Sequence, residues 1–171
     1  MLRKFAIVLS VVAMLFVGAS GAYERNLAVT IPPLHDLQSD AQLADGRKIP
    51  LLLLFASESC PYCVQVEEEF IKPMIISGHY TDKVLIRHVM VDSYERVTAF
   101  DGATISIDQL ARRYGVSLVP TVVIVDARGE QLVPRLVGIT TRDFYGGELD
   151  DAIDASLAKL RRGVAASLST P

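Results

Sequence analysis

Residues 49–56 form an almost wholly apolar segment, and this segment constrains the fold more than any other part of the chain. A run of this length and composition predicts a strand whose two faces are both covered by other elements. The next segment, residues 61–76, places Val66, Phe70 and Met74 at four-residue spacing, which predicts a helix with one buried stripe. The chain is therefore predicted to pass from a buried strand into a helix just after residue 56.

Shorter patterns predict the rest of the secondary structure. They are a short helix near residues 34–44, strands at 84–91, 121–125 and 132–137, a helix opened by a capping box of Ser106 and Gln109, and a last helix at 149–160. The turn at 126–129 is short enough for an antiparallel hairpin between the last two strands. Two helix interruptions are also expected. Pro73 bends or ends the first long helix, and Gly146 and Gly147 break any helical turn that begins after Thr141.

The first 22 residues have the three parts of a secretory signal peptide. Arg3 and Lys4 give a positive start, residues 5–17 are apolar, and the small residues Ser20 and Ala22 precede a cleavage point. An uncleaved membrane anchor is the alternative, but the apolar run is shorter than the roughly 20 residues that span a bilayer. We therefore expect this segment to be removed. The mature protein is then periplasmic, without stable membrane insertion, in a compartment that permits disulfides.

The predicted domain organisation has four parts: a signal peptide at 1–22, an N-terminal arm at 23–48, one folded domain at 49–162 and a flexible tail at 163–171. The full chain is 50% hydrophobic and 22% charged with a net charge of −3, so general disorder and a basic nucleic-acid-binding surface are both excluded. Two cysteines are too few for a disulfide framework, but they can form one redox pair.

Both cysteines occur in the motif Cys60-Pro61-Tyr62-Cys63, at the predicted strand-to-helix junction. The partial positive charge at a helix N-terminus stabilises a thiolate. Pro61 suits the first helical position, because its φ is already helical and its missing N–H would have had no partner there. Cys63 follows three residues later on the same helix face and is expected to be less accessible. Cys60 is therefore the candidate attacking thiol and Cys63 the resolving thiol, acting through a mixed disulfide.

The spacing gives less support to two other interpretations of the pair. A zinc site would need two more ligands, and the histidines, His35, His79 and His88, lie far apart in the sequence. A static disulfide would close a loop too short to stabilise the fold much. We expect neither a metal nor a cofactor. His88 is most simply a core or edge histidine of its strand, and the acidic run at 67–69 is most simply a solvated helix face.

The second informative motif is G-V-S-L-V-P-T at residues 115–121, which leads into the strand at 121–125. Together with C-P-Y-C and the order of predicted elements, it resembles the thioredoxin superfamily over residues 49–160. The F-D-G sequence at residues 100–102, before a helix ending in L-A-R-R-Y-G-V, is most similar to exported bacterial thioredoxin-like proteins, including those associated with sulfur oxidation. The resemblance implies an α/β thioredoxin fold with a central mixed sheet of four to five strands flanked by helices.

The resemblance also implies a substrate-binding surface around the cysteine pair. Pro120 is expected to be cis and to lie beside the two cysteines, while the Val119 backbone pairs with an extended substrate segment. Pro61 and Tyr62, between the cysteines, complete the expected substrate-binding set.

The chain departs from ordinary thioredoxins at several positions. Ser59 stands where they have Trp, and Pro61-Tyr62 stands where they have Gly-Pro. Their buried aspartate, six residues before the first cysteine, is replaced by Leu54, so we expect Glu58 or water to take over proton transfer. C-P-Y-C is also the glutaredoxin active-site sequence.

These observations predict a periplasmic protein thiol:disulfide oxidoreductase, acting as a reductase on protein disulfide or thiol substrates and re-reduced by a membrane electron donor. A disulfide-donating oxidase is the nearest alternative, because potentials in this superfamily span roughly −270 to −120 mV. A glutathione-linked, glutaredoxin-like enzyme and a non-catalytic thioredoxin-fold binding module are the other two. Alkylation near neutral pH separates the last from the enzymes, since a catalytic thiolate reacts quickly.

Overall fold

The computed structural model describes residues 29–168, with side chains through residue 163. The predicted signal peptide at 1–22 and its cleavage point lie outside these residues. Within the described range, no helix combines the length and the hydropathy needed to cross a membrane. The described residues from Ile31 onward belong to one compact unit.

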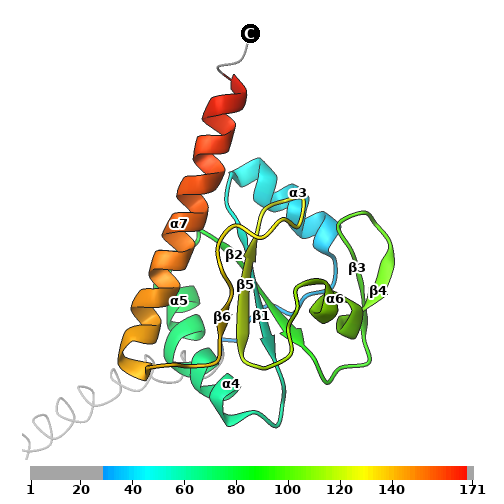
Figure 1. Cartoon of the computed structure of the whole chain (residues 1–171), viewed down its shortest axis with the longest axis vertical. Coiled ribbons are helices and arrows are strands. Elements are labelled where there is room, and N and C mark those ends of the chain that lie inside the picture. The colour runs from blue at the N-terminus through cyan, green and yellow to red at the C-terminus, as the bar shows by residue number, and fades with distance from the viewer. Residues whose placement is uncertain (1–28, 169–171) are drawn as a thin grey trace, which may run out of the picture. The chain divides into compact units, whose positions relative to one another are not determined.

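A four-stranded mixed sheet lies at the centre of this unit, in the order β2-β1-β5-β6 (Figure 1). Its strands are β1 (Leu51–Ala56), β2 (Leu85–Met90), β5 (Thr121–Val125) and β6 (Leu136–Val137). β1 pairs with β2 in parallel and with β5 in antiparallel orientation. Every residue of β1 and β5 is buried, which explains why both segments are apolar almost throughout. The strand predicted at 121–125 is confirmed with the same ends, and those predicted at 49–56 and 84–91 are confirmed with slightly different ends.

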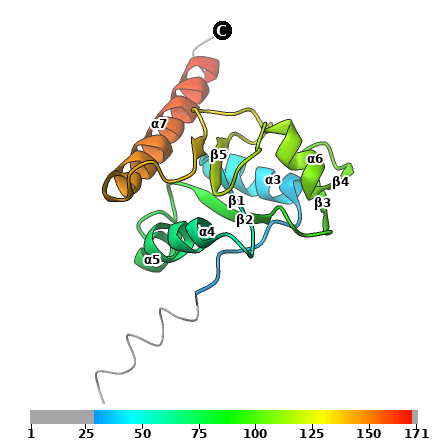
Figure 2. The same cartoon turned by 60° about the horizontal axis from the view of Figure 1, so that its bottom comes forward.

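Helices cover both faces of the sheet, as Figure 2 shows. One face packs against α3 (Leu37–Arg47) and α6 (Ile107–Arg113), and the other against α4 (Pro61–Val66), η1 (Glu67–Ile71), α5 (Lys72–Ser77) and much of α7 (Arg142–Leu168). Side chains of β1 alternate between the two resulting cores, with Leu53 in the first and Leu54 in the second. The predicted α/β architecture of a mixed sheet flanked by helices is confirmed.

The N-terminal arm is tied to the outer edge of β2. The His88 N–H donates to Pro32 O and the Leu34 N–H donates to His88 O, each over 2.8 Å. Asp36 then caps α3 by accepting a backbone hydrogen bond of 2.9 Å. The short helix predicted near residues 34–44 is therefore present as α3, displaced toward the C-terminus.

The sequence patterns do not predict a second, two-stranded sheet, which consists of β3 (Arg96–Thr98) and β4 (Thr104–Ser106). Strands of three residues are too short to show an alternation of apolar and polar positions. The capping box of α6 follows directly and is confirmed. Ser106 Oγ accepts from the Gln109 N–H at 3.2 Å, and the Ser106 N–H donates to Gln109 Oε1 at 2.9 Å.

The strand predicted at 132–137 is wrong over its first four residues, because only its end, Leu136–Val137, pairs with β5 as a strand. Pro134 has no N–H to donate, so the ladder cannot continue through it. Before the proline, the Leu132 N–H still bonds to Ile124 O at 2.9 Å. The antiparallel hairpin is therefore present but interrupted.

Pro73 lies inside a continuous helical segment that runs to Ser77, so it does not end the helix. The π-helical turn η1 precedes it, with the Lys72 N–H bonding to Glu67 O. A proline ring crowds the carbonyl four residues earlier, here that of Glu69, and a wider turn at this place relieves the crowding.

The helix α7 passes through both Gly146 and Gly147, so the break expected there is wrong. The Phe70 ring packs against Gly146, where an added Cβ would lie 3.4 Å from two ring carbons. Tyr145, beside it, is buried, with its ring centroid 5.0 Å from that of Phe70. This packing stabilises a helix that glycine propensity alone disfavours. α7 also includes the first part of the tail predicted at 163–171, whose last three residues lie outside the described part.

Candidate active site

Cys60 stands at the N-cap of α4, where the chain leaves the loop after β1 (Figure 1). Its backbone is extended, with φ −100° and ψ 105°, and Pro61 opens the helix. The Cys63 N–H donates to Cys60 Sγ over 3.2 Å, a contact that favours negative charge on that sulfur. Both thiols are free, and Cys60 is partly exposed whereas Cys63 is fully buried. One accessible and one hidden thiol are what the attacking and resolving roles require.

Burial raises the pKa of the Cys63 thiol to about 12. The hydrogen bond with the Cys60 side chain and the negative charges of Cys60 and Glu67 act in the same direction, whereas a backbone hydrogen bond from Ser57 opposes them. Cys63 is therefore a neutral thiol at neutral pH. It needs a proton acceptor before it can attack a mixed disulfide, because only the thiolate is nucleophilic.

The second predicted motif lies against Cys60. The Cys60 thiol donates to the Val119 carbonyl oxygen at 3.7 Å, across 59 positions of sequence. The Val119–Pro120 peptide bond is cis, and Pro120 is buried. Within the described residues, the Val119 N–H makes no backbone hydrogen bond. The fold thus brings the two sequence motifs together and leaves a backbone donor beside the accessible sulfur.

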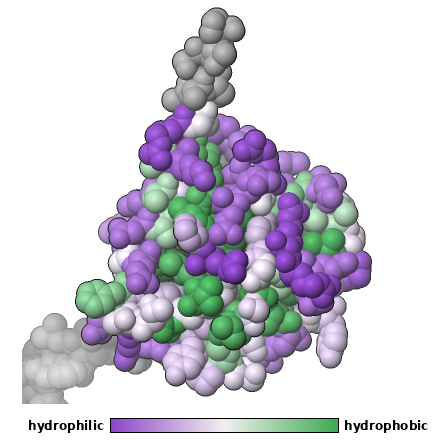
Figure 3. All heavy atoms as spheres, in the orientation of Figure 1, coloured by the Kyte–Doolittle hydropathy of each residue, from purple (hydrophilic) through white to green (hydrophobic). Residues whose placement is uncertain are grey.

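Two large side chains with apolar surface are exposed next to this contact. Tyr62, between the cysteines, is 65% exposed, and Leu118, next to Val119, is 66% exposed. In the view of Figure 3, apolar surface gathers over the lower part of the face, toward the end of the sheet where Figure 1 shows α4. Large exposed apolar side chains beside a thiol fit a surface that contacts another chain.

Glu58, predicted to take part in proton transfer, is exposed in the loop before Cys60. Its N–H donates to Asp92 Oδ2 at 3.0 Å, and Ser57 Oγ donates to the same oxygen at 2.8 Å. The hydrogen bond from Ser57, followed by that from the Glu58 backbone, lowers the pKa of Asp92. Asp92 therefore holds the loop before the cysteine motif, a role that the sequence analysis missed. Its position directly after the strand predicted at 84–91 is the signal that points to it.

The interpretation of residues 67–69 as a solvated helix face is wrong for Glu67. Its side chain is only 19% exposed, and its Oε1 lies 3.1 Å from Nε2 of His88, which is 17% exposed. Glu68 and Glu69 do face solvent. The sequence held a signal for this orientation, because Glu67 follows Cys63 by four residues and so shares its helix face. His88 lies on β2, the outer strand of the sheet, as a partly buried edge histidine.

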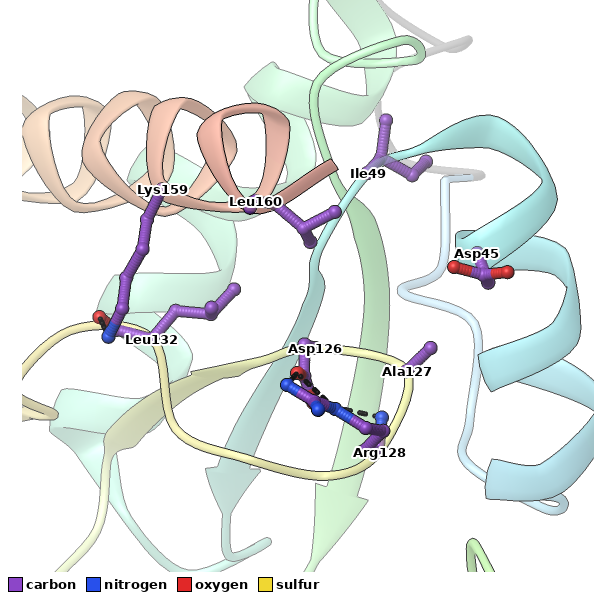
Figure 4. Close-up of a pocket in the computed structure, with 9 residues that line it drawn as sticks. Asp45, Ile49, Asp126, Ala127, Arg128, Leu132, Lys159 and Leu160 are labelled. Carbon is purple, nitrogen blue, oxygen red and sulfur yellow. Dashed lines mark hydrogen bonds and ion pairs between the residues drawn. The ribbon is translucent and has the colours of Figure 1, made fainter. Parts of the chain in front are cut away.

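Two hollows lie at opposite ends of the sheet. One, of about 430 Å³, adjoins the cysteine loop and is lined in part by Glu58, His88 and Asp92. The other, of about 460 Å³, lies where Ile49 precedes β1 and Asp126 follows β5, away from the cysteines (Figure 4). Over the part of the chain that the structure describes, no three His, Cys, Asp or Glu side chains gather in a way that could hold a metal ion.

A family model of the thioredoxin-like domain matches residues 37–153. The chain belongs to the thioredoxin-like domain family. The match includes both the cysteine motif and the cis-proline of this thioredoxin-like chain, and it begins at α3. No curated protein matches the sequence.

Solved structures similar to this thioredoxin-like chain include two thioredoxins and another oxidoreductase. Mitochondrial thioredoxin 3 from Saccharomyces cerevisiae is 18% identical, with a TM-score of 0.48, over 72% of this chain and 93% of its own. Thioredoxin from Fasciola hepatica is 18% identical, with a TM-score of 0.47, over 72% of this chain and 97% of its own. DsbH oxidoreductase is 15% identical, with a TM-score of 0.54, over 75% of this chain and 88% of its own. This last similarity shows a shared fold.

Proposed function

We propose that this protein is a periplasmic thiol:disulfide oxidoreductase that reduces disulfides of other proteins through Cys60 and Cys63. The geometry around Cys60 carries the proposal. Cys60 is partly exposed and stands at a helix N-cap, and its sulfur accepts the Cys63 N–H at 3.2 Å and lies 3.7 Å from the Val119 carbonyl oxygen. Membership of the thioredoxin-like domain family supports thiol chemistry, and the predicted signal peptide supports export.

The reaction consists of two thiol–disulfide exchanges. The Cys60 thiolate attacks one sulfur of the substrate disulfide, so that a Cys60–substrate bond forms and the other substrate sulfur leaves as a thiolate, which takes up a proton. Cys63 then loses its proton and attacks the Cys60 sulfur. The Cys60–substrate bond breaks, and the second substrate thiolate leaves and is protonated. The substrate gains two electrons, and the dithiol of the enzyme is oxidised to a disulfide. A dithiol donor at the membrane restores the reduced pair by the reverse exchange.

The substrate segment is proposed to lie in extended form beside Val119. The Val119 N–H, without a backbone partner among the described residues, supplies a donor for one strand-like hydrogen bond. The exposed rings and side chains of Pro61, Tyr62 and Leu118 supply apolar contacts on either side of the sulfur. In this proposal, specificity comes from backbone pairing and apolar area, which suits varied protein substrates.

Two serine variants test the mechanism, with insulin as the disulfide substrate and dithiothreitol as the electron source. Cys60→Ser should reduce insulin no faster than the uncatalysed background. After reduction and removal of dithiothreitol, Cys63→Ser should trap a mixed disulfide with the substrate, visible on a non-reducing gel and by mass spectrometry. Turnover above background in Cys60→Ser contradicts the mechanism.

The reduction potential of the Cys60/Cys63 pair decides between a reductase and a disulfide-donating oxidase. Titration of the purified protein against a glutathione buffer should give a value close to about −270 mV for a reductase, whereas a value near about −120 mV would make the protein an oxidase. Turnover supported by millimolar glutathione would instead indicate a glutaredoxin-like enzyme. Slow alkylation of Cys60 near neutral pH would indicate a binding module.

A further inference from the structure

Cys63 is buried in a core to which β1 and β5 contribute no base. β1 contributes Leu52, Leu54 and Ala56 to this core, and β5 contributes Val122 and Ile124. Three titratable groups interact electrostatically with Cys63. The charges of Cys60 and Glu67 raise the pKa of the Cys63 thiol, and the charge of Cys63 in turn raises the pKa of Tyr145 on α7. His88, on β2, lies within ion-pair distance of Glu67 and is connected to the Cys63 thiol through that carboxylate. We therefore expect the proton acceptor for Cys63 to be Glu67, Tyr145 or His88.

Glu67 has the position of a base for Cys63. It lies one helical turn after Cys63, and its N–H bonds to the Cys63 carbonyl oxygen, so the two side chains share a helix face. Its side chain is 19% exposed, whereas Glu68 and Glu69 face solvent. The negative charge of Glu67 contributes to the raised pKa of Cys63, so the carboxylate and the thiol are close enough to influence each other.

His88 turns Glu67 toward the sheet. In the register of β1 and β2, His88 stands beside Leu54, on the sheet face that α4 covers. Its Nε2 lies 3.1 Å from Glu67 Oε1, within ion-pair distance, but without the geometry of a hydrogen bond. Nε2 of His88 and the Tyr145 hydroxyl are the two buried side-chain polar atoms left without a hydrogen bond in the described part of the chain. Buried side-chain polar atoms without a partner are rare in folded proteins.

The hollow of about 430 Å³ gives this pair a route to solvent. His88 lines it together with Glu58 and Asp92, from the two loops at the C-terminal ends of β1 and β2. A proton that reaches the imidazole therefore has beside it a cavity lined in part by carboxylates, whereas the Cys63 side of the pair is apolar.

We propose that Glu67 is the base that takes the Cys63 proton. His88 is the positioning residue, which holds the Glu67 carboxylate toward the sheet and passes the proton to the hollow. The inference rests on the proposed disulfide-exchange function. In this step the Cys63 S–H bond breaks, its proton goes to the Glu67 carboxylate, and the freed electron pair forms the bond to the Cys60 sulfur. The Cys60–substrate bond breaks, and its electron pair leaves with the substrate thiolate, which takes a proton from solvent. Glu67 then returns its proton through His88.

Replacement of Glu67 separates a base from a simple charge, because the two roles predict opposite results. If Glu67 contributes charge alone, Glu67→Gln removes a negative charge near Cys63, lowers the pKa of the thiol and speeds resolution. If Glu67 takes the proton, the same change slows resolution at neutral pH by about tenfold or more and removes the acid limb of its pH profile. Glu68→Gln is the matched control, since it makes the same charge change on an exposed neighbour.

The experiment follows the mixed disulfide between the reduced protein and insulin in a single turnover, by acid quench and mass spectrometry at several pH values. We expect Glu67→Gln to form the mixed disulfide at the wild-type rate, because Cys60 is untouched, and then to accumulate it. His88→Gln should slow resolution less, and Glu68→Gln should match the wild type. Resolution in Glu67→Gln at or above the wild-type rate overturns the proposal. Slowing in Tyr145→Phe alone also overturns it and assigns the proton to the tyrosine.

Two controls distinguish this proposal from its alternatives. Glu67→Asp keeps a carboxylate and should show the acid limb again; its absence in that variant counts against the proposal. A misfolded variant would lose the first exchange as well as the second, so an unchanged first step shows an intact site. Failure of the proposed function has another signature, because then Cys63→Ser forms no mixed disulfide at all, and that result overturns both.

Discussion

Alkaline pH should destabilise this protein through Cys63, and the structure sets the size of the effect. The side chain is fully buried, and its pKa is raised from 9.0 to about 12. The folded protein therefore keeps this proton at pH values where the unfolded chain has lost it. The stabilisation from this group is complete below the unfolded pKa of 9.0 and is lost as the pH rises through the folded value of about 12.

The magnitude follows from the difference between the two pKa values. One pKa unit corresponds to about 1.4 kcal/mol, so the whole shift is worth about 4 kcal/mol, and about half of it is lost midway between the two values. Burial also raises the pKa values of Tyr114 and Tyr145 to about 12, and these groups add to the same slope. The charge of Cys63 makes the smallest contribution to the Tyr145 shift, so the difference between the wild type and a Cys63 variant reports mainly on Cys63.

Urea unfolding of the reduced protein measures this difference between about pH 8 and pH 11, the range that brackets the unfolded thiol titration. Lost packing in Cys63→Ala should change the free energy of unfolding by a roughly constant amount at every pH. Loss of the thiol should in addition make the decline of this free energy above the unfolded pKa less steep. Cys60→Ala is the control, because it leaves Cys63 buried and should keep most of the slope. Parallel declines for the wild type and Cys63→Ala would refute the reasoning.

Three further substitutions test an ion pair and two glycine positions of the fold. Arg87 Nε donates to Asp40 Oδ2 at 2.7 Å between side chains that are only 17% and 11% exposed. Asp40→Asn should therefore lower the free energy of unfolding by about 2–3 kcal/mol in urea titrations, and a loss under about 0.5 kcal/mol contradicts this. Gly129 has φ +77°, and an added Cβ would lie 2.8 Å from the Phe100 ring, so Gly129→Ala should cost more than about 2 kcal/mol. Gly78→Ala, with φ +70° and open space around it, should cost only about 1 kcal/mol by the same measurement, and equal losses would show that the ring contact does not matter.

The buried strands could be predicted from the sequence because burial on both faces leaves a local record. A residue of β1 or β5 faces a core whichever way it points, so the segments 49–56 and 121–125 are apolar at nearly every position. The helix starts at Cys60 and Ser106 are also local, since an N-cap and its first turn involve residues within three positions of each other.

Predictions failed where a residue distant in the sequence decides the local structure. Gly146 stays helical because the Phe70 ring, from another helix, packs against it. Pro73 stays helical because the preceding turn widens, and single-residue propensity contains no information on such a turn. The strand predicted at 132–137 is wrong for a local reason, because Pro134 interrupts the ladder within the segment.

The sequence by itself determined the pair of thiols: one at a helix N-cap and one three residues later, hidden beneath it. Only the tertiary structure decided what surrounds them. The Val119 carbonyl meets Cys60 because β1 and β5 are neighbours in the sheet, and Glu67 turns inward because the register of β1 and β2 sets His88 beneath its helix. Contacts of this kind join segments far apart in the chain, so they depend on strand order and register, which no local pattern encodes.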